Sequence, residues 1–331
     1  MAALASAWPI LERMSVRSVR CQRHLGLRLK APGLPPVIGR YPDDSRLALG
    51  VRCVSSSDSG SGDNAGSGQT NSYINLGVFN TMATDDARMA VGIAYMMDAL
   101  RLQRDEYNGE AAPPRRASKG LTLSTTLLQV AKQHHSTGDS EEALRLYEES
   151  LEVLKESRTF YEGVMQDKDG KPVTKVIRVL QQAIFQQTEI YVGLGMACHE
   201  VGRSEESINW LKDAMDARKE LLGGQHPSVS ECLNNLAAVY FNREAYQKSV
   251  EYYEQALELL IAANDGVKEG EYLALTYYNI GTCRLRLGQQ SLAVQSLDLA
   301  RKLAEQAYEA GHPMIDLIKQ TQEQAFAARS E

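Results

Sequence analysis

The stretch from His226 to Leu260 holds two segments in which apolar residues return at steps of three and four. In the first segment they are Leu233, Leu236, Ala237 and Tyr240, and in the second Tyr246, Val250, Tyr253, Ala256 and Leu257. This spacing predicts two amphipathic helices with a break at Asn242–Ala245. Small residues lie where two helices must come close and large ones lie beside them, so the two helices are expected to form a hairpin.

The same pattern recurs along the chain, as it must if one hairpin buries its apolar faces against others. About 44 residues further on, the matching positions are Tyr277, Ile280, Gly281, Ala293, Leu297 and Ala300. About 42 residues back, they are Tyr191, Leu194, Gly195, Ser207, Leu211 and Ala214. A further step back, longer by about 20 residues, reaches Leu127, Val130, Ala131, Ala143, Tyr147 and Ser150. Turns that contain Gly138, Gly202 and Gly288 separate the two helices of three units, and Arg243-Glu244 stands there in the remaining one.

This alternation of small and large residues resembles the tetratricopeptide repeat (TPR). The long period and the segment GGQHPSVSECLNNLAAVY are similar to the kinesin-light-chain type of that repeat. Four units match, over residues 121–303. The resemblance implies an all-α fold, an α-solenoid of four helix pairs that binds other proteins and has no chemistry of its own.

Segments on both sides of the four units are expected to cover their open ends. A single helix is predicted within residues 81–110, as a cap, and a partner-binding or membrane-surface helix is the alternative. Ala111–Gly120 contains prolines and a glycine and is expected to link this helix to the first repeat. At the other end, a polar-faced capping helix is predicted over residues 312–328, with Ile315, Ile318 and Ala325 facing the last repeat.

The first and second units are separated by extra residues, which are expected to lengthen two helices or to add one. They include QDKDGKPV at Gln166–Val173, where two aspartates precede a glycine. Lysines and a proline occupy positions at which a calcium loop needs oxygen ligands, so a tight turn is predicted instead.

The first 54 residues differ from the rest in charge. They hold nine Lys or Arg and three acidic residues, whereas the remainder has a net charge of −12. An Arg-rich, acid-poor, amphipathic N-terminus is typical of a transit peptide, and a basic tail of a cytosolic protein is the alternative. Residues 55–80 begin with a run of Ser and Gly that predicts a flexible linker. We expect a mitochondrial protein, with a plastid as the alternative location.

Composition and motifs exclude several classes of function. An acidic repeat region is poorly suited to nucleic acid, because backbone phosphates demand positive charge. The chain has no long uncharged apolar run of the kind a transmembrane helix needs. It also lacks CxxC, HExxH, nucleophile-elbow and P-loop patterns, so we expect no metal, no cofactor and no enzymatic activity. Cys198, Cys232 and Cys283 fall on first helices and are predicted to be buried, reduced thiols.

Residues one step off the packing stripe of each first helix are the candidates for a partner-binding groove on the concave face. They are Lys132, His135, Glu189, His199, Asn234, Asn235, Tyr278 and Asn279. Asn235 and Asn279 occupy equivalent places, and in the family an Asn there commonly hydrogen-bonds the backbone of a bound peptide. The alternative is that these asparagines bond neighbouring loops or face water. Leu128 stands where a chaperone-tail clamp would need a lysine, so that type of partner is not expected.

These observations predict a non-catalytic scaffold, adaptor or assembly factor of an organellar protein complex that binds a protein or extended peptide ligand. One alternative is a permanent structural subunit of such a complex. Another is a cytosolic cargo adaptor resembling the kinesin light chains, although those carry a heptad coiled coil before the repeats and none is visible in this sequence.

Overall fold

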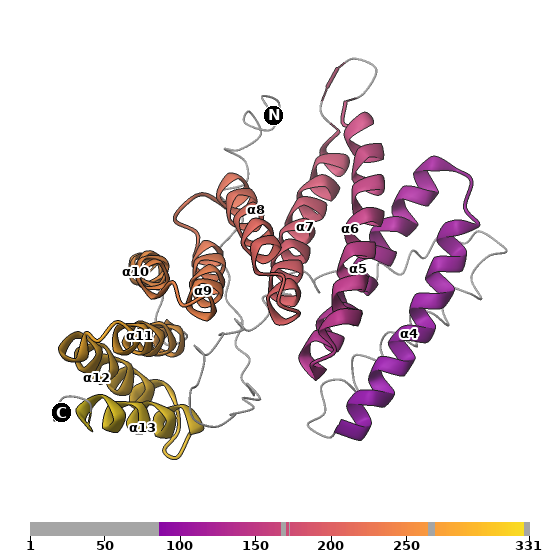
Figure 1. The fold of residues 1–331 in the computed structure, drawn as a ribbon. Helices are drawn as coiled ribbons and strands as arrows, with labels where there is room; N and C mark the ends of the chain where they lie inside the picture. Colours follow the sequence, from indigo (N-terminus) through magenta and orange to yellow (C-terminus); the bar gives the residue numbers. More distant parts are fainter. Residues whose placement is uncertain (1–85, 167–169, 172, 264–268, 328–331) are drawn as a thin grey trace. The chain divides into compact units, whose positions relative to one another are not determined.

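The computed structural model describes residues 86–327 apart from 167–169, 172 and 264–268. The predicted transit peptide at 1–54 and linker at 55–80 lie outside this part of the chain. Within it are ten α-helices, shown in Figure 1: α4 Asp86–Asn108, α5 Pro113–Thr137, α6 Ser140–Gly163, α7 Thr174–Glu200, α8 Ser204–Leu222, α9 Pro227–Asn242, α10 Tyr246–Ala263, α11 Glu269–Arg286, α12 Gln290–Ala307 and α13 Pro313–Ala327.

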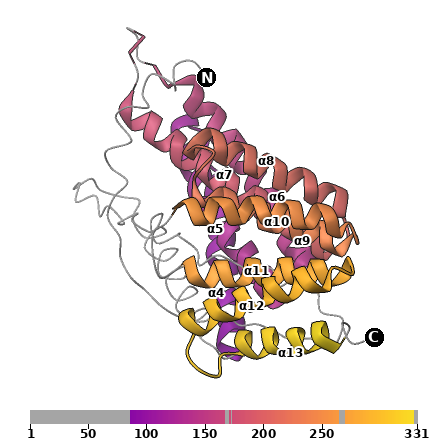
Figure 2. The same cartoon turned by 90° about the vertical axis from the view of Figure 1, so that its left-hand side faces the viewer.

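The helices pack in the order in which they occur in the chain. Four pairs form the repeat units, α5 with α6, α7 with α8, α9 with α10 and α11 with α12. Each second helix also packs against the first helix of the next unit, and Figure 2 shows α10, α11, α12 and α13 following one another in this way. First helices also contact each other across unit boundaries: α5 contacts α7, and α7 contacts α9. The fold is the predicted all-helical TPR solenoid.

The predicted stripes of apolar residues form the core. Leu194, Leu211, Leu236 and Leu297 are all fully buried. The small residues have the expected role of admitting a large neighbour. A Cβ atom built on Gly195 would lie 2.6 Å from Cγ of Leu211, and one built on Gly281 would lie 2.7 Å from Cγ of Leu297. A methyl group at either position would force the two helices of the unit apart.

The four units turn between their helices in one way, whether or not a glycine is present. Gly138 has a φ of 87° and is followed by an amide that donates to the carbonyl of His134. In the third unit Glu244 adopts the same left-handed backbone, with a φ of 60°, and the amide of Ala245 donates to the carbonyl of Tyr240 at 2.9 Å. The surrounding repeat therefore imposes on Glu244 a conformation that most side chains disfavour.

The predicted linker at Ala111–Gly120 is wrong, because α5 already begins at Pro113. The prolines occupy the first helical positions, where a missing amide hydrogen costs nothing. Gly120 lies inside the helix for a packing reason, since an added Cβ would lie 2.1 Å from Oγ of Ser157 and 3.0 Å from the ring of Tyr107. The glycine lets α5 approach α6 and α4 closely.

Both ends of the array are covered. Helix α4 packs on α5 and buries Met96 and Leu100, as a cap would. Helix α13 packs on α12 and buries Ile315, Ile318 and Ala325 against the last unit. The extra residues between the first two units lengthen both adjoining helices, α6 to 24 residues and α7 to 27.

Candidate partner-binding surfaces

The eight predicted groove residues fall into two groups by burial. Four of them offer almost no surface: His135 is 6% exposed, Asn235 4%, Tyr278 1% and Asn279 3%. Lys132, Glu189, His199 and Asn234 are half-buried. The prediction that all eight face an open groove is therefore wrong for the first group, whereas their part in partner binding stays a prediction. A first helix can also contact the first helices of neighbouring units, as α7 contacts α5 and α9, and a single helical stripe in the sequence cannot show those neighbours.

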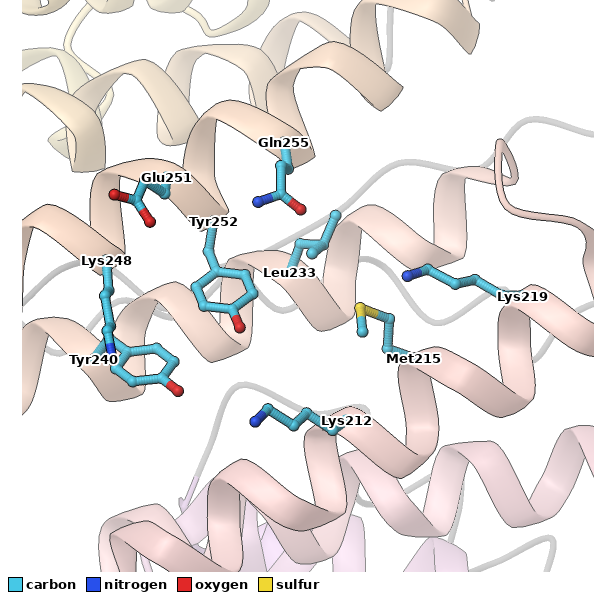
Figure 3. Close-up of a pocket in the computed structure, with 9 residues that line it drawn as sticks. All are labelled: Lys212, Met215, Lys219, Leu233, Tyr240, Lys248, Glu251, Tyr252 and Gln255. Carbon is cyan, nitrogen blue, oxygen red and sulfur yellow. The ribbon is translucent and has the colours of Figure 1, made fainter.

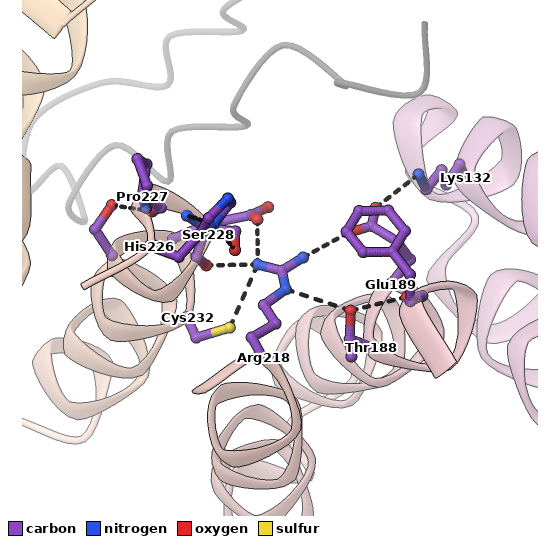
Figure 4. A network of polar contacts seen from close by, with 11 residues as sticks. Lys132, Thr188, Glu189, Arg218, His226, Pro227, Ser228 and Cys232 are labelled. Atoms are coloured by element: carbon purple, nitrogen blue, oxygen red, sulfur yellow. Dashed lines mark hydrogen bonds and ion pairs between the residues drawn. The ribbon is translucent and has the colours of Figure 1, made fainter. Parts of the chain in front are cut away.

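Two of the half-buried residues belong to an ionic chain that crosses three units (Figure 4). Lys132 Nζ on α5 lies 3.2 Å from Oε2 of Glu189 on α7. The other oxygen of Glu189 accepts from Nη2 of Arg218 on α8. Nη1 of Arg218 in turn lies 2.5 Å from Oε2 of Glu231 on α9. The four side chains alternate in charge and join α5, α7, α8 and α9.

Arg218 is the centre of this chain and is only 1% exposed. Its Nη1 also donates to the backbone oxygen of Ser228 at 2.7 Å. Burial alone would lower the pKa of Arg218, but the negative charges of Glu231 and Glu189 outweigh it and raise that pKa. The arginine thus stays charged in the interior because two carboxylates, one from each neighbouring first helix, lie against its guanidinium group.

Arg218 is absent from the residues predicted from sequence, although a signal was present. Leu211, Ala214 and Arg218 follow each other at steps of three and four, which places the arginine on the buried stripe of α8. A charged residue on such a stripe needs partners inside the fold.

A second link between first helices involves His199. Its Nε2 accepts a hydrogen bond of 2.6 Å from Nδ2 of Asn242, which joins the C-terminal ends of α7 and α9. Burial lowers the pKa of His199, and the nearby charge of Glu200 opposes that shift. The ring is held in its neutral form and serves as an acceptor in the structure.

The second helices carry a different surface, a groove between α8 and α10 with α9 as its floor (Figure 3). It consists of two adjoining hollows of about 470 and about 390 Å³ that share Lys212, Tyr240 and Lys248. The remaining lining residues are Met215, Lys219, Leu233, Glu251, Tyr252 and Gln255 in one hollow, and Glu205, Ile208, Asn209, Arg243 and Ala245 in the other. We call this the α8–α10 groove.

Two tyrosines form the middle of the α8–α10 groove. The rings of Tyr240 and Tyr252 are stacked, with centroids 5.3 Å apart and planes 7° from parallel. Nζ of Lys248 lies 5.7 Å from the centroid of the Tyr240 ring, within range of a cation–π contact. The groove therefore has aromatic surface below and ammonium groups along its walls.

The residues that the structure describes hold no cluster of metal ligands, and the thiols of Cys232 and Cys283 are buried. Among the described residues there is no group of three or more His, Cys, Asp or Glu side chains that could hold a metal ion. Burial raises the pKa of Cys232 and of Cys283 to about 12, so both thiols stay protonated. No helix in the described part of the chain is long and apolar enough to cross a membrane.

Comparison with known proteins gives a family match for part of the chain. Residues 186–262 match the model of the tetratricopeptide repeat. Comparison with the curated proteins finds no significant match.

Solved structures that match this chain include BtubC (BKLC) from P. vanneervenii, at 17% identity and a TM-score of 0.49 over 75% of this chain and 95% of that one. A kinesin-light-chain-like protein from Podosopora anserina with nearly identical TPR-like repeats has 17% identity and a TM-score of 0.42, over 67% and 90% of the two chains. MamA has 18% identity and a TM-score of 0.39, over 67% and 96%. Residues 186–262 thus match the tetratricopeptide repeat, and the helices on both sides of them pack in the same sequential pairs.

Proposed function

We propose that this chain is a non-catalytic scaffold or assembly factor that binds a protein or an extended peptide inside mitochondria. The observation that carries the proposal is the TPR solenoid itself, in which four helix pairs pack one after another. Such arrays of stacked units generally serve as protein-interaction modules, because their surface grows with each unit. The half-buried Lys132, Glu189, His199 and Asn234 add polar groups along the first helices.

The composition of the leader supports the organelle. Residues 1–54 have a net positive charge, with nine Lys or Arg against three acidic residues, and six basic residues recur from Arg13 to Lys30 with apolar residues between them. Positive charge favours import into a compartment with a negative interior, and an amphipathic helix suits recognition at its surface. A plastid location rests on the same features.

The experiment uses the full chain with a C-terminal tag, expressed in its own cells. Organelles are fractionated, and the tagged protein is resolved on a native gel, followed by mass spectrometry of co-migrating proteins. We expect a shortened form inside mitochondria that associates with other proteins and also exists free of them. A form found only within one stable complex, and degraded without it, would favour the permanent structural subunit. An unprocessed form in the cytosol would overturn the organellar proposal and favour the cargo adaptor.

A further inference from the structure

We propose that the α8–α10 groove binds an acidic, extended peptide segment of a partner protein, with carboxylates between Lys212 and Lys248 and an apolar side chain beside Tyr252. The inference rests on the proposed function and adds to it a second binding surface, on the second helices, and the chemistry of its ligand. The first argument is that three of the four cations that line this groove have no ion-pair partner among the residues that the structure describes. Lys212, Lys219 and Lys248 form no ion pair with a residue that the structure describes, whereas Arg243 is paired with Glu205 at 2.7 Å.

The second argument comes from equivalent positions in the neighbouring units. The repeat offsets that align the core also align the walls of the successive grooves. At the boundary between the first and second units, the positions of Lys212 and Lys248 are held by Glu148 and Glu206. At the boundary between the third and fourth units, Glu254 and Leu292 hold them. Two facing lysines are thus a property of the α8–α10 groove and not of the repeat.

The third argument is the floor of the groove. Arg284 on α11 occupies the place of Tyr240, and it donates to Glu254 at 2.9 Å and to Ser296 at 2.7 Å. The boundary between the third and fourth units therefore neutralises the charge on its own wall. In the α8–α10 groove the same place on α9 holds the uncharged ring of Tyr240, so the floor of the groove supplies no counterion for Lys212.

The shape and chemistry of the lining indicate a peptide. Leu233, Met215 and the stacked tyrosines supply apolar surface beside the ammonium groups, and Asn209 and Gln255 supply amides that can bond a peptide backbone. A nucleic acid also combines stacking with negative charge, but it would place a run of phosphates against a repeat region whose net charge is negative. A short acidic segment makes its contacts within the groove alone.

The test uses the full chain and a fluorescein-labelled dodecapeptide with the repeated sequence Asp-Phe-Glu-Gly, followed by fluorescence anisotropy. The comparison probes are the same peptide with Asn and Gln in place of the acids, and a single-stranded RNA of twelve nucleotides. We expect the acidic peptide to bind, the amide version to bind about tenfold more weakly, and the affinity to fall as salt is raised. Saturable binding of the RNA in preference to the acidic peptide would overturn the proposal.

The variant that locates the site is Lys212→Glu with Lys248→Glu, and its matched control is Lys155→Glu with Lys302→Glu, which makes the same charge change on exposed positions of α6 and α12. The groove variant should bind the acidic peptide at least about tenfold more weakly, while Lys212→Arg with Lys248→Arg and the control should bind like the wild type. Equal losses of affinity in the groove variant and the control would show a nonspecific charge effect and refute the site.

If the peptide does not bind although native gels show protein partners, this inference fails and the proposed function stands. A chain without partners in cells refutes the proposed function.

Discussion

Arg218 on α8 donates to Glu189 on α7 although its guanidinium group is almost completely removed from water. The same arginine reaches Glu231 on α9, so one side chain holds three helices of two units together. A charge in such a place stabilises the fold only while its partners remain. Removing it leaves two carboxylates facing each other in a partly desolvated space.

Replacement of Arg218 by methionine, of similar length and without charge, should therefore lower the free energy of unfolding by about 3 kcal/mol. Urea unfolding followed by circular dichroism measures the change. Arg203→Met is the matched control, because Arg203 lies at the start of the same helix and forms an exposed ion pair with Glu206 at a separation of three residues. The control should leave the urea midpoint almost unchanged. If Arg218→Met unfolds at the wild-type midpoint, the ionic chain contributes nothing to the contact between units.

A second prediction concerns the close approach of α6 and α7. Gly193 lies opposite the ring of Tyr147, and an added Cβ would lie 2.4 Å from Cε1 of that ring. Alanine is the better helix former, by about 1 kcal/mol. Gly193→Ala should nevertheless destabilise the protein by about 1–2 kcal/mol, because the buried tyrosine has no room to move. Gly163→Ala is the control, since nothing lies within 4 Å of its added Cβ, and it should not destabilise. A more stable Gly193→Ala variant would contradict the packing argument.

The sequence predicts the fold well because each core position of the unit recurs in the other units. Leu211 and Leu297 occupy one place in two units, so the evidence for a buried leucine in that place is doubled. Gly120 shows where this reasoning stops. A glycine after two prolines indicates a linker locally, and only the contacts with Ser157 on α6 and Tyr107 on α4 explain why it lies within α5.

The candidate surfaces are less predictable from sequence, because they depend on contacts between different helices. A stripe on one helix shows which side packs against its partner, but it does not show that Asn235 and Asn279, which lie beside the stripe, are buried as well. The aligned repeats show that Lys212 and Lys248 stand where other units mostly have glutamates. Only the structure shows that both lysines line one groove with Tyr240. Pairing between units is a property of the assembled array.

A third prediction is a dependence of stability on pH through His199. Burial lowers the pKa of His199 in the folded chain, whereas in the unfolded chain it stays near the ordinary value of about 6.5. Between these two pKa values the unfolded chain binds more protons, so the free energy of unfolding must fall as the pH drops below about 6.5. Protonation of Nε2 would also remove the acceptor for the amide of Asn242.

The measurement is urea unfolding at several pH values between 7.5 and 5, for the wild type and for His199→Gln. Glutamine keeps an acceptor for Asn242 but does not titrate, so the variant should lose less stability over this range than the wild type. Parallel pH profiles of the two proteins would show that His199 does not contribute to the dependence.

The last prediction concerns the basic leader. Within residues 1–54, Arg13 and Arg17 lie in the stretch where basic and apolar residues alternate, whereas Arg40 and Arg46 lie beyond it. If import requires a positively charged amphipathic helix, Arg13→Glu with Arg17→Glu should abolish it, while Arg40→Glu with Arg46→Glu should be tolerated. Each charge moved across a membrane potential of 100 mV changes the free energy by about 2.3 kcal/mol, which applies equally to both pairs. A difference in import between the two variants therefore reports the amphipathic helix and not the total charge.

Import is measured as the protected, shortened form after protease treatment of isolated mitochondria. Equal import of both variants and the wild type would mean that the leader is not read as an amphipathic helix, whereas no import of the wild type would mean that the basic N-terminus is a tail of a cytosolic protein.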